Sequence, residues 1–164
     1  VELVDYIRRT FHLALKPENT FTMGMSMGGF GAVHTALAYP KTFGKCVGLS
    51  SALIVHQIAH MKPESSNPVA NYEYYRECFG DLETVEERDV NPEVLALNLK
   101  NAGEKIPGIY LACGTEDFLL EPNRAFDKFL TENKIDHVYT EDKGQHDMEF
   151  WLKYAVPALE WLCK

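Results

Sequence analysis

The sequence predicts an α/β fold in which a mostly parallel sheet carries helices on both faces. Short apolar runs bounded by turn residues alternate with longer segments of helical spacing, which is typical of parallel sheets. A Gly-x-Ser-x-Gly pattern at residues 24–28 falls between a strand-like and a helix-like segment. The content of 46% apolar residues in a chain of 164 is enough for one buried core. We therefore expect a single domain over residues 1–164.

The first elements lead up to this pattern. Apolar residues at helical spacing predict an amphipathic helix over residues 1–15 that covers the sheet. Residues 19–25 predict a short strand, and residues 27–39 predict a helix of small residues that ends before Pro40. The chain opens in what reads as the middle of a helix, without an initiator methionine, so we expect a piece of a longer domain.

The turn between this strand and this helix holds the serine of the pattern. An abrupt turn would leave Ser26 on a strained backbone with its hydroxyl pointing outward. We expect Gly24 and Gly28 to leave the space that the turn needs, because a side chain at either position would collide with a neighbouring element. The alternative is that the serine merely caps the helix.

The middle of the chain contains one strand and then a long excursion. The apolar run at 45–50 predicts a strand that is buried on both faces. No strand-like run occurs between about 52 and 105, which predicts a helical insert over the sheet. Within this insert, Asn91 as cap and Pro92 at the first position mark the start of a helix.

Regular alternation then resumes to the end of the chain. The predicted elements are a strand at 108–114, a helix at 121–133, a strand at 136–140 and a helix at 148–163. Pro157 lies inside the last helix, so we expect a kink or a restart there.

Charge and cysteine spacing narrow the function classes. The formal net charge is −8 and the 16 Lys and Arg residues are scattered, so we expect no nucleic-acid partner and no membrane partner. The sequence contains no run of about 18 apolar residues, so no membrane-spanning helix is predicted. The cysteines form no Cys-x-x-Cys pair, which argues against a zinc or dithiol site and predicts buried free thiols and a cytoplasmic location. They are Cys46, Cys78, Cys113 and Cys163.

Three predicted strand ends carry groups suited to nucleophilic catalysis. Ser26 follows the first strand, Asp117 follows the strand at 108–114, and His146 follows the strand at 136–140. The carboxyl ends of parallel strands meet at one edge of a sheet, where functional groups gather. The chain order Ser, Asp, His is that of the α/β-hydrolase catalytic triad.

Acyl-transfer chemistry gives each of these groups a role. The hydroxyl of Ser26 is a poor nucleophile at neutral pH and needs an adjacent base, for which His146 is the candidate. Asp117 would hold the imidazole in the correct tautomer. The backbone N–H of Met27, at the start of the helix, would bind the oxyanion. We expect no metal and no cofactor.

Other acidic residues compete for the role of Asp117. Glu116 is the local rival. Asp142 and Asp147 flank His146 and could orient it, but they look more like turn and helix-cap residues.

The other histidines give weaker signals. His56 and His60 lie four residues apart, a spacing that can place two metal ligands on one helix face, but no third ligand is evident. We expect His12, His34 and His137 to be structural or exposed.

Taken together, three motifs resemble the esterase D group of α/β-hydrolases. The motifs are residues 24–29, residues 113–119, and residues 144–146 followed by an aromatic helix with Phe150 and Trp151. This group includes tributyrin-type, acetylxylan and feruloyl esterases and S-formylglutathione hydrolases. The resemblance covers essentially the whole chain.

The resemblance implies a serine carboxylesterase that hydrolyses small acyl esters of an alcohol or a carbohydrate through an acyl-enzyme. Its spacing favours Asp117 over Glu116. The sheet of the family begins with further strands before the nucleophile, and one of their connections supplies part of the oxyanion hole. Without those strands, the chain is expected to be weakly active alone.

Two alternatives for the function stay open. The same triad serves an S-formylglutathione-type thioesterase or an acyltransferase, and a non-catalytic binding or assembly module could keep the hydrolase body. An unpaired strand edge next to the nucleophile would favour a homo-oligomer. The expected pocket walls are aromatic: Tyr72, Tyr74, Tyr75 and Phe118.

Overall fold

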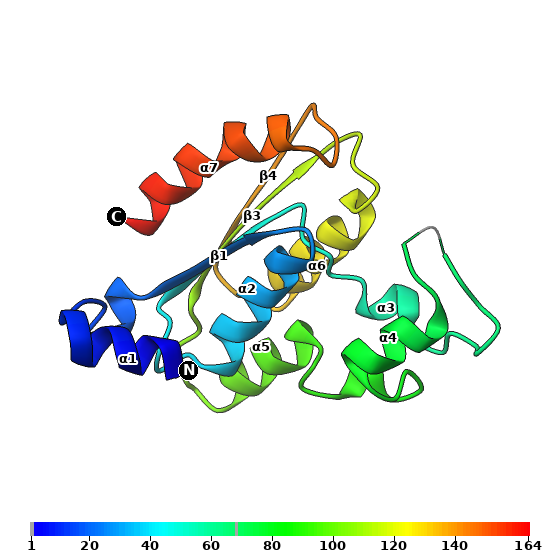
Figure 1. Cartoon of the computed structure of the whole chain (residues 1–164), viewed down its shortest axis with the longest axis horizontal. Helices are drawn as coiled ribbons and strands as arrows, with labels where there is room; N and C mark the ends of the chain where they lie inside the picture. Colours follow the sequence, from blue (N-terminus) through cyan, green and yellow to red (C-terminus); the bar gives the residue numbers. More distant parts are fainter. Residues whose placement is uncertain (1, 68) are drawn as a thin grey trace.

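Residues 2–67 and 69–164 are described by a computed structural model, in which four parallel strands form one sheet in the order β1-β2-β3-β4 (Figure 1). Met25 lies opposite Leu49, and Leu49 lies opposite Ala112, so the carboxyl ends of neighbouring strands come together. All three strand pairs are parallel, which confirms the predicted fold class. The strands are β1 (Phe21–Met25), β2 (Lys45–Leu49), β3 (Gly108–Gly114) and β4 (His137–Asp142).

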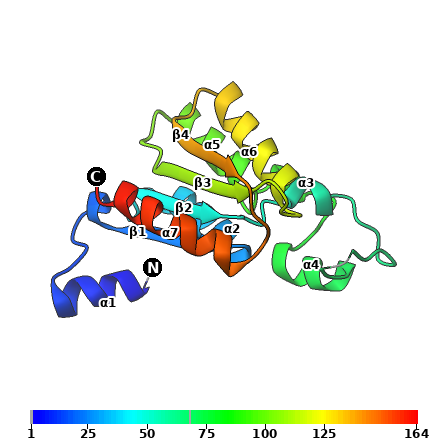
Figure 2. The same ribbon diagram turned by 90° about the horizontal axis from the view of Figure 1, so that it is seen from above.

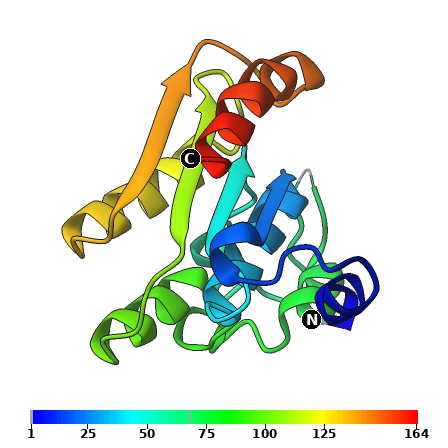
Figure 3. The ribbon, with the colours of Figure 1, turned by 90° about the vertical axis from the view of Figure 1, so that its left-hand side faces the viewer.

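Helices cover both faces of this sheet (Figures 1 and 3). On β3, Ile109 and Leu111 pack into one core cluster, whereas Tyr110 and Ala112 pack into another, because successive side chains of a strand point to opposite faces. The first cluster contains residues of three helices and the second contains residues of one. These are α2 (Met27–Ala38), α5 (Pro92–Asn101) and α6 (Leu120–Glu132) on one face, and α7 (Met148–Leu162) on the other.

The predicted insert is helical, and its residues form most of a separate buried cluster to which Leu119 also belongs. It contains α3 (Val55–Ile58), α4 (Tyr72–Phe79) and a short 3-10 turn, η2 (Val85–Glu87), before α5. Figure 2 shows α3 and α4 beyond the arrowheads of the strands. Asn91 caps α5 as predicted, since its side-chain oxygen accepts a hydrogen bond from the N–H of Glu93 at 3.1 Å. The division into one domain with this insert stays a prediction.

The first helix differs from its prediction. It is α1 (Glu2–Phe11), with residue 1 outside the described residues, and none of its described residues is buried. His12 and Ala14 adopt positive φ angles of 55° and 50°, which end the helix before Leu15. A 3-10 turn, η1 (Pro17–Asn19), then leads into β1. Val4 packs against the core cluster on the α2 face. Figure 2 nevertheless shows α1 lying to one side of the sheet, so the expectation that it covers the sheet is met only at Val4.

The last helix is continuous. α7 passes through Pro157 without a restart. Pro157 is exposed, so the carbonyl that loses its intrahelical donor can be hydrated. Across the described part of the chain, no helix combines the length and the apolar character needed to cross a membrane.

Candidate active site

The turn between β1 and α2 holds Ser26 in a backbone conformation that is rare for a residue with a side chain. Its φ is 55° and its ψ is −123°. Its N–H donates to the carbonyl oxygen of Leu49 at 2.9 Å, which ties the turn to the end of β2. The side chain of Ser26 makes no capping hydrogen bond to α2, so the helix-cap interpretation is wrong.

The two glycines of the pattern are not equivalent. A Cβ atom on Gly24 would lie 2.1 Å from the carbonyl oxygen of Gly28, so only glycine fits there. A Cβ atom on Gly28 would meet nothing within 4 Å. The predicted collision at Gly28 is therefore wrong. The second close approach occurs at Gly29, where a Cβ atom would lie 2.5 Å from Oγ of Ser51.

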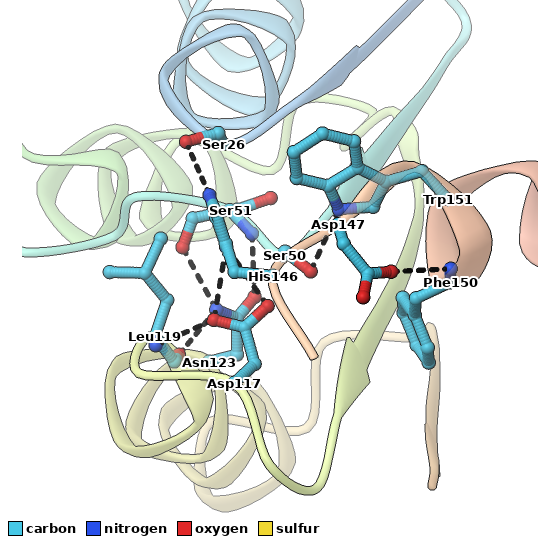
Figure 4. A network of polar contacts seen from close by, with 10 residues as sticks. All are labelled: Ser26, Ser50, Ser51, Asp117, Leu119, Asn123, His146, Asp147, Phe150 and Trp151. Atoms are coloured by element: carbon cyan, nitrogen blue, oxygen red, sulfur yellow. Dashed lines mark hydrogen bonds and ion pairs between the residues drawn. The ribbon is translucent and has the colours of Figure 1, made fainter. Parts of the chain in front are cut away.

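The three predicted side chains form one hydrogen-bonded line (Figure 4). Nε2 of His146 lies 3.0 Å from Oγ of Ser26. Nδ1 of His146 lies 3.0 and 2.9 Å from the two carboxylate oxygens of Asp117. The Asp117 side chain is fully buried, and its Oδ1 also accepts the N–H of Leu119 at 2.8 Å. The imidazole is thus held at both nitrogens, between the hydroxyl of Ser26 and a fixed carboxylate.

The rival carboxylates have other partners. Glu116 is exposed and lies 3.5 Å from the side-chain nitrogen of Gln145. Asp147 caps α7, where its carboxylate accepts the N–H of Phe150 at 3.0 Å. Asp142 pairs with Lys153 and with the hydroxyl of Tyr154. The hydrogen bond from Lys153 is the main reason why the pKa of Asp142 lies below its usual range.

Backbone hydrogen bonds hold together the two loops that carry Asp117 and His146. The N–H of Thr115 donates to the carbonyl of Asp142, and the N–H of Glu116 donates to the carbonyl of Gly144, both at 2.9 Å. This close approach needs a glycine, because a Cβ atom on Gly114 would lie 2.3 Å from the Gly144 oxygen.

A cavity of about 350 Å³ opens beside Ser26. Three of the four predicted aromatic walls line it, namely Tyr74, Tyr75 and Phe118, whereas Tyr72 does not. Its other lining residues are Met27, Ala52, Ile54, Gln57, Asn67, Val69 and Leu119. A larger cavity of about 570 Å³, between α1 and β1, contains none of the three residues of the line.

Residues 1–162 match a protein family described as "Putative esterase". The chain belongs to this esterase family.

Known members and structures agree with this assignment. The chain is 44% identical over 163 residues to an acetyl esterase of Caldicellulosiruptor saccharolyticus. Among solved structures, it is similar to FphF, a fluorophosphonate-binding serine hydrolase of Staphylococcus aureus, at 25% identity and a TM-score of 0.84. It is also similar to the S-formylglutathione hydrolase FrmB of that organism, at 26% identity and a TM-score of 0.83.

These matches confirm the α/β-hydrolase fold of this esterase-family chain. Each of them covers 99% of this chain. The chain spans only 61% of the length of each of these relatives.

A buried asparagine beside the loop of Asp117 could not be predicted from the sequence. Asn123, in the first turns of α6, is completely buried. Its amide nitrogen donates to the carbonyls of Ser51 at 2.8 Å and Leu119 at 2.7 Å, and its oxygen accepts the N–H of Ser51 at 3.3 Å. It therefore joins the segment after β2 to the loop of Asp117. An asparagine inside a helical pattern gives no signal of such a role.

The remaining histidines lie outside the site. The helix α3 ends at Ile58, before His60, so the two residues that the spacing could have placed on one helix face do not share one. His56 instead contacts Glu86 at 2.5 Å and Glu93 at 3.0 Å. In the described residues, no group of three His, Cys, Asp or Glu side chains is arranged to hold a metal ion.

The three other histidines match their expectation. His137 lies 2.8 Å from a carboxylate oxygen of Asp127, and His34 lies 3.0 Å from the backbone carbonyl of Asp89. His12 is exposed.

The cysteines match their prediction only in part. Cys46 and Cys113 are buried, and burial raises the pKa of each thiol to about 12. Cys78 and Cys163 are exposed, contrary to the expectation. Cys78 lies on the solvent-facing side of α4, and Cys163 directly follows the end of α7.

Proposed function

We propose that this chain carries the nucleophile, the base and the orienting carboxylate of a serine carboxylesterase that acts on small acyl esters. The observation that carries the proposal is the hydrogen-bonded line from Ser26 through His146 to Asp117. Membership of the esterase family supports the same reaction class.

In the first half-reaction, His146 acts as base and then as acid. Its Nε2 accepts the proton of Ser26 as Oγ attacks the ester carbonyl carbon. When the tetrahedral intermediate collapses, the C–O bond to the alcohol breaks and His146 returns the proton to the departing oxygen. The products are the free alcohol and an acyl group on Ser26.

In the second half-reaction, water takes the place of the alcohol. His146 accepts a proton from the water as its oxygen attacks the acyl carbon, and then returns this proton to Oγ of Ser26. The acid leaves and the free enzyme is restored. Throughout, Asp117 accepts the Nδ1–H, which leaves Nε2 free as the base and stabilises the imidazolium when it forms.

The negative charge of the intermediate needs donors at the start of α2. The first amides of a helix have no partner within the helix, and the helix dipole places partial positive charge there. Met27 is the first residue of α2 and lines the cavity beside Ser26, so its N–H is the proposed oxyanion donor.

The substrate class proposed here is a small acyl ester, including esters of carbohydrates. The 44% identity to an acetyl esterase supports it. A thioester is the second candidate, because one of the similar structures is an S-formylglutathione hydrolase and the steps above would apply unchanged. Rates with p-nitrophenyl acetate and with S-formylglutathione, measured side by side, distinguish the two candidates.

The test of the proposal is covalent labelling of the chain with a fluorophosphonate, read by intact mass. We expect one adduct on the parent chain and none on Ser26→Ala. A folded parent chain that takes no label and hydrolyses neither substrate would contradict the proposal and favour a binding or assembly role.

A further inference from the structure

The imidazole of His146 is restrained along one direction by its hydrogen bonds. Both bonds are made at ring nitrogens, to Ser26 on one side and Asp117 on the other. Such bonds fix the ring along the line between its two partners. They restrain its rotation about that line much less.

An indole ring contacts the imidazole from the side. The ring of Trp151, in the first turn of α7, meets that of His146 edge to face, with centroids 5.0 Å apart and an interplanar angle of 87°. The ring of Phe118 also contacts the imidazole, at 4.5 Å, but Phe118 is 62% exposed. The half-buried Trp151 is therefore the better-fixed of the two contacts.

The indole is itself anchored to the sheet (Figure 4). Its Nε1–H donates to Oγ of Ser50 at 3.0 Å. Ser50 is completely buried directly after β2, and its N–H donates to the carbonyl of Ala112 at 2.8 Å. Its φ of 45° is in the left-handed region that is unfavourable for serine, so the surrounding structure holds it there.

This anchor and the nucleophile share one strand end. The carbonyl oxygen of the preceding residue, Leu49, accepts the N–H of Ser26, while Oγ of Ser50 accepts the indole N–H of Trp151. Residues at the carboxyl end of β2 thus contact both the backbone of Ser26 and, through Trp151, the ring of His146. The distance between Oγ of Ser26 and Nε2 of His146 therefore depends on contacts with the same strand end.

We propose that Trp151, held by Ser50, is a positioning residue that fixes the tilt of the His146 imidazole toward Ser26. The inference rests on the proposed esterase function, in which His146 is the base. A small misplacement of a base can cost up to about a hundredfold in rate. Trp151 acts through His146 and does not touch the reacting atoms.

Two single variants and their combination test this role. Trp151→Phe keeps an aromatic ring but removes the N–H donor, and Ser50→Ala removes the acceptor. We expect each to lower kcat for p-nitrophenyl acetate roughly ten- to hundredfold, with KM changed less than about twofold. The double variant should be no slower than the slower single variant, because both changes delete the same hydrogen bond.

The matched control is Trp161→Phe. It makes the same chemical change in the same helix, about three turns further on, where the ring contacts Tyr110 and Lys45 instead of His146. We expect its kcat to stay within about twofold of the parent. Thermal unfolding of all variants shows whether each one is folded.

A second readout does not depend on turnover. The Nδ1–H of His146 gives a far-downfield proton NMR signal when it is held on Asp117, and the signal broadens when the ring moves. We expect it to be sharp in the parent and in Trp161→Phe, and broadened in the Trp151 and Ser50 variants.

The outcomes separate this inference from the proposed function. Parent-like kcat and parent-like NMR signals in both variants would overturn the positioning role, while the parent's own activity would still support the esterase. An equal loss in Trp161→Phe would also overturn it, since the effect would then belong to α7 as a whole. A parent chain without activity, but with broadened signals in only the Trp151 and Ser50 variants, would support positioning and reject the proposed function.

Discussion

At the scale of single residues, Ser26 stands on a backbone that its neighbours hold in place. A positive φ at a residue with a side chain costs on the order of 1–3 kcal/mol. At Ser26 the backbone is held by the hydrogen bond to Leu49, and β1 approaches α2 closely at Gly24. The strain places Oγ within reach of His146 instead of at the helix end as a cap.

The two glycines on either side of Ser26 give the first prediction. In Gly24→Ala, the new methyl group would overlap the backbone of Gly28, so we expect a loss of at least about 3 kcal/mol in unfolding free energy or a failure to fold. Gly28→Ala is the matched control. It enters open space inside α2, so we expect unchanged stability or a gain of up to about 1 kcal/mol. Urea unfolding measures both, and equal losses in the two variants would contradict the geometry.

The carboxylate partner of His146 gives the second prediction. Asp117→Asn keeps the shape of the side chain but favours the wrong imidazole tautomer, so we expect kcat to fall by about 10³–10⁴, by analogy with the serine-protease triad. Glu116→Gln changes the exposed neighbour in the same way and should leave kcat within about twofold. Initial rates with p-nitrophenyl acetate decide between them. A larger loss in the Glu116 variant would reject the assignment of Asp117.

At the scale of elements, the sequence predicted strands and helices well where local pattern and tertiary position agree. The runs at 45–50 and 108–114 are buried on both faces, so their continuous apolar pattern identified β2 and β3. The helix predicted over 1–15 forms at Glu2–Phe11 but covers little of the sheet. Val4 packs against the core, whereas Leu3, Tyr6 and Phe11 are 68%, 53% and 57% exposed. Periodicity shows that a helix has an apolar side, but not what covers that side.

The short helix α3 gives a prediction on pH. Burial lowers the pKa of His56, but hydrogen bonds and charges from Glu86 and Glu93 outweigh it and hold the pKa above its usual value. A raised pKa in the folded state means that the contact stabilises the fold below the unfolded-state pKa, near 6.5. This stabilisation is lost as pH rises through the folded-state pKa.

His56→Gln tests this pH dependence. We expect it to cost more unfolding free energy at pH 5.5 than at pH 8.5, with a difference below about 1 kcal/mol because the ring is about half exposed. His34→Gln is the control, since the contact of the His34 ring is with the backbone carbonyl of Asp89 and not with a carboxylate. Chemical unfolding at the two pH values measures the difference. A cost for His56→Gln that is independent of pH would contradict the role of the two glutamates.

At the scale of the whole molecule, the sequence could predict that Ser26, Asp117 and His146 lie together, because each follows a strand of one parallel sheet. Their catalytic roles stay a prediction, as do the cytoplasmic location and the homo-oligomer. The supports around them could not be predicted. Ser50, Asn123 and Trp151 make hydrogen bonds between segments that are distant along the chain. Trp151 stands in one of the motifs of the resemblance, but that motif does not indicate its bond to Ser50.

The separation of these segments along the chain has a consequence for folding. Oγ of Ser26 and Nε2 of His146 meet across 120 positions in the sequence. Contacts of such long range form late and slowly, because a large loop must close before they contribute to stability. We expect fluorophosphonate reactivity to return during refolding no earlier than tryptophan fluorescence, so that the chemistry of the serine reports the completion of the last long-range contacts.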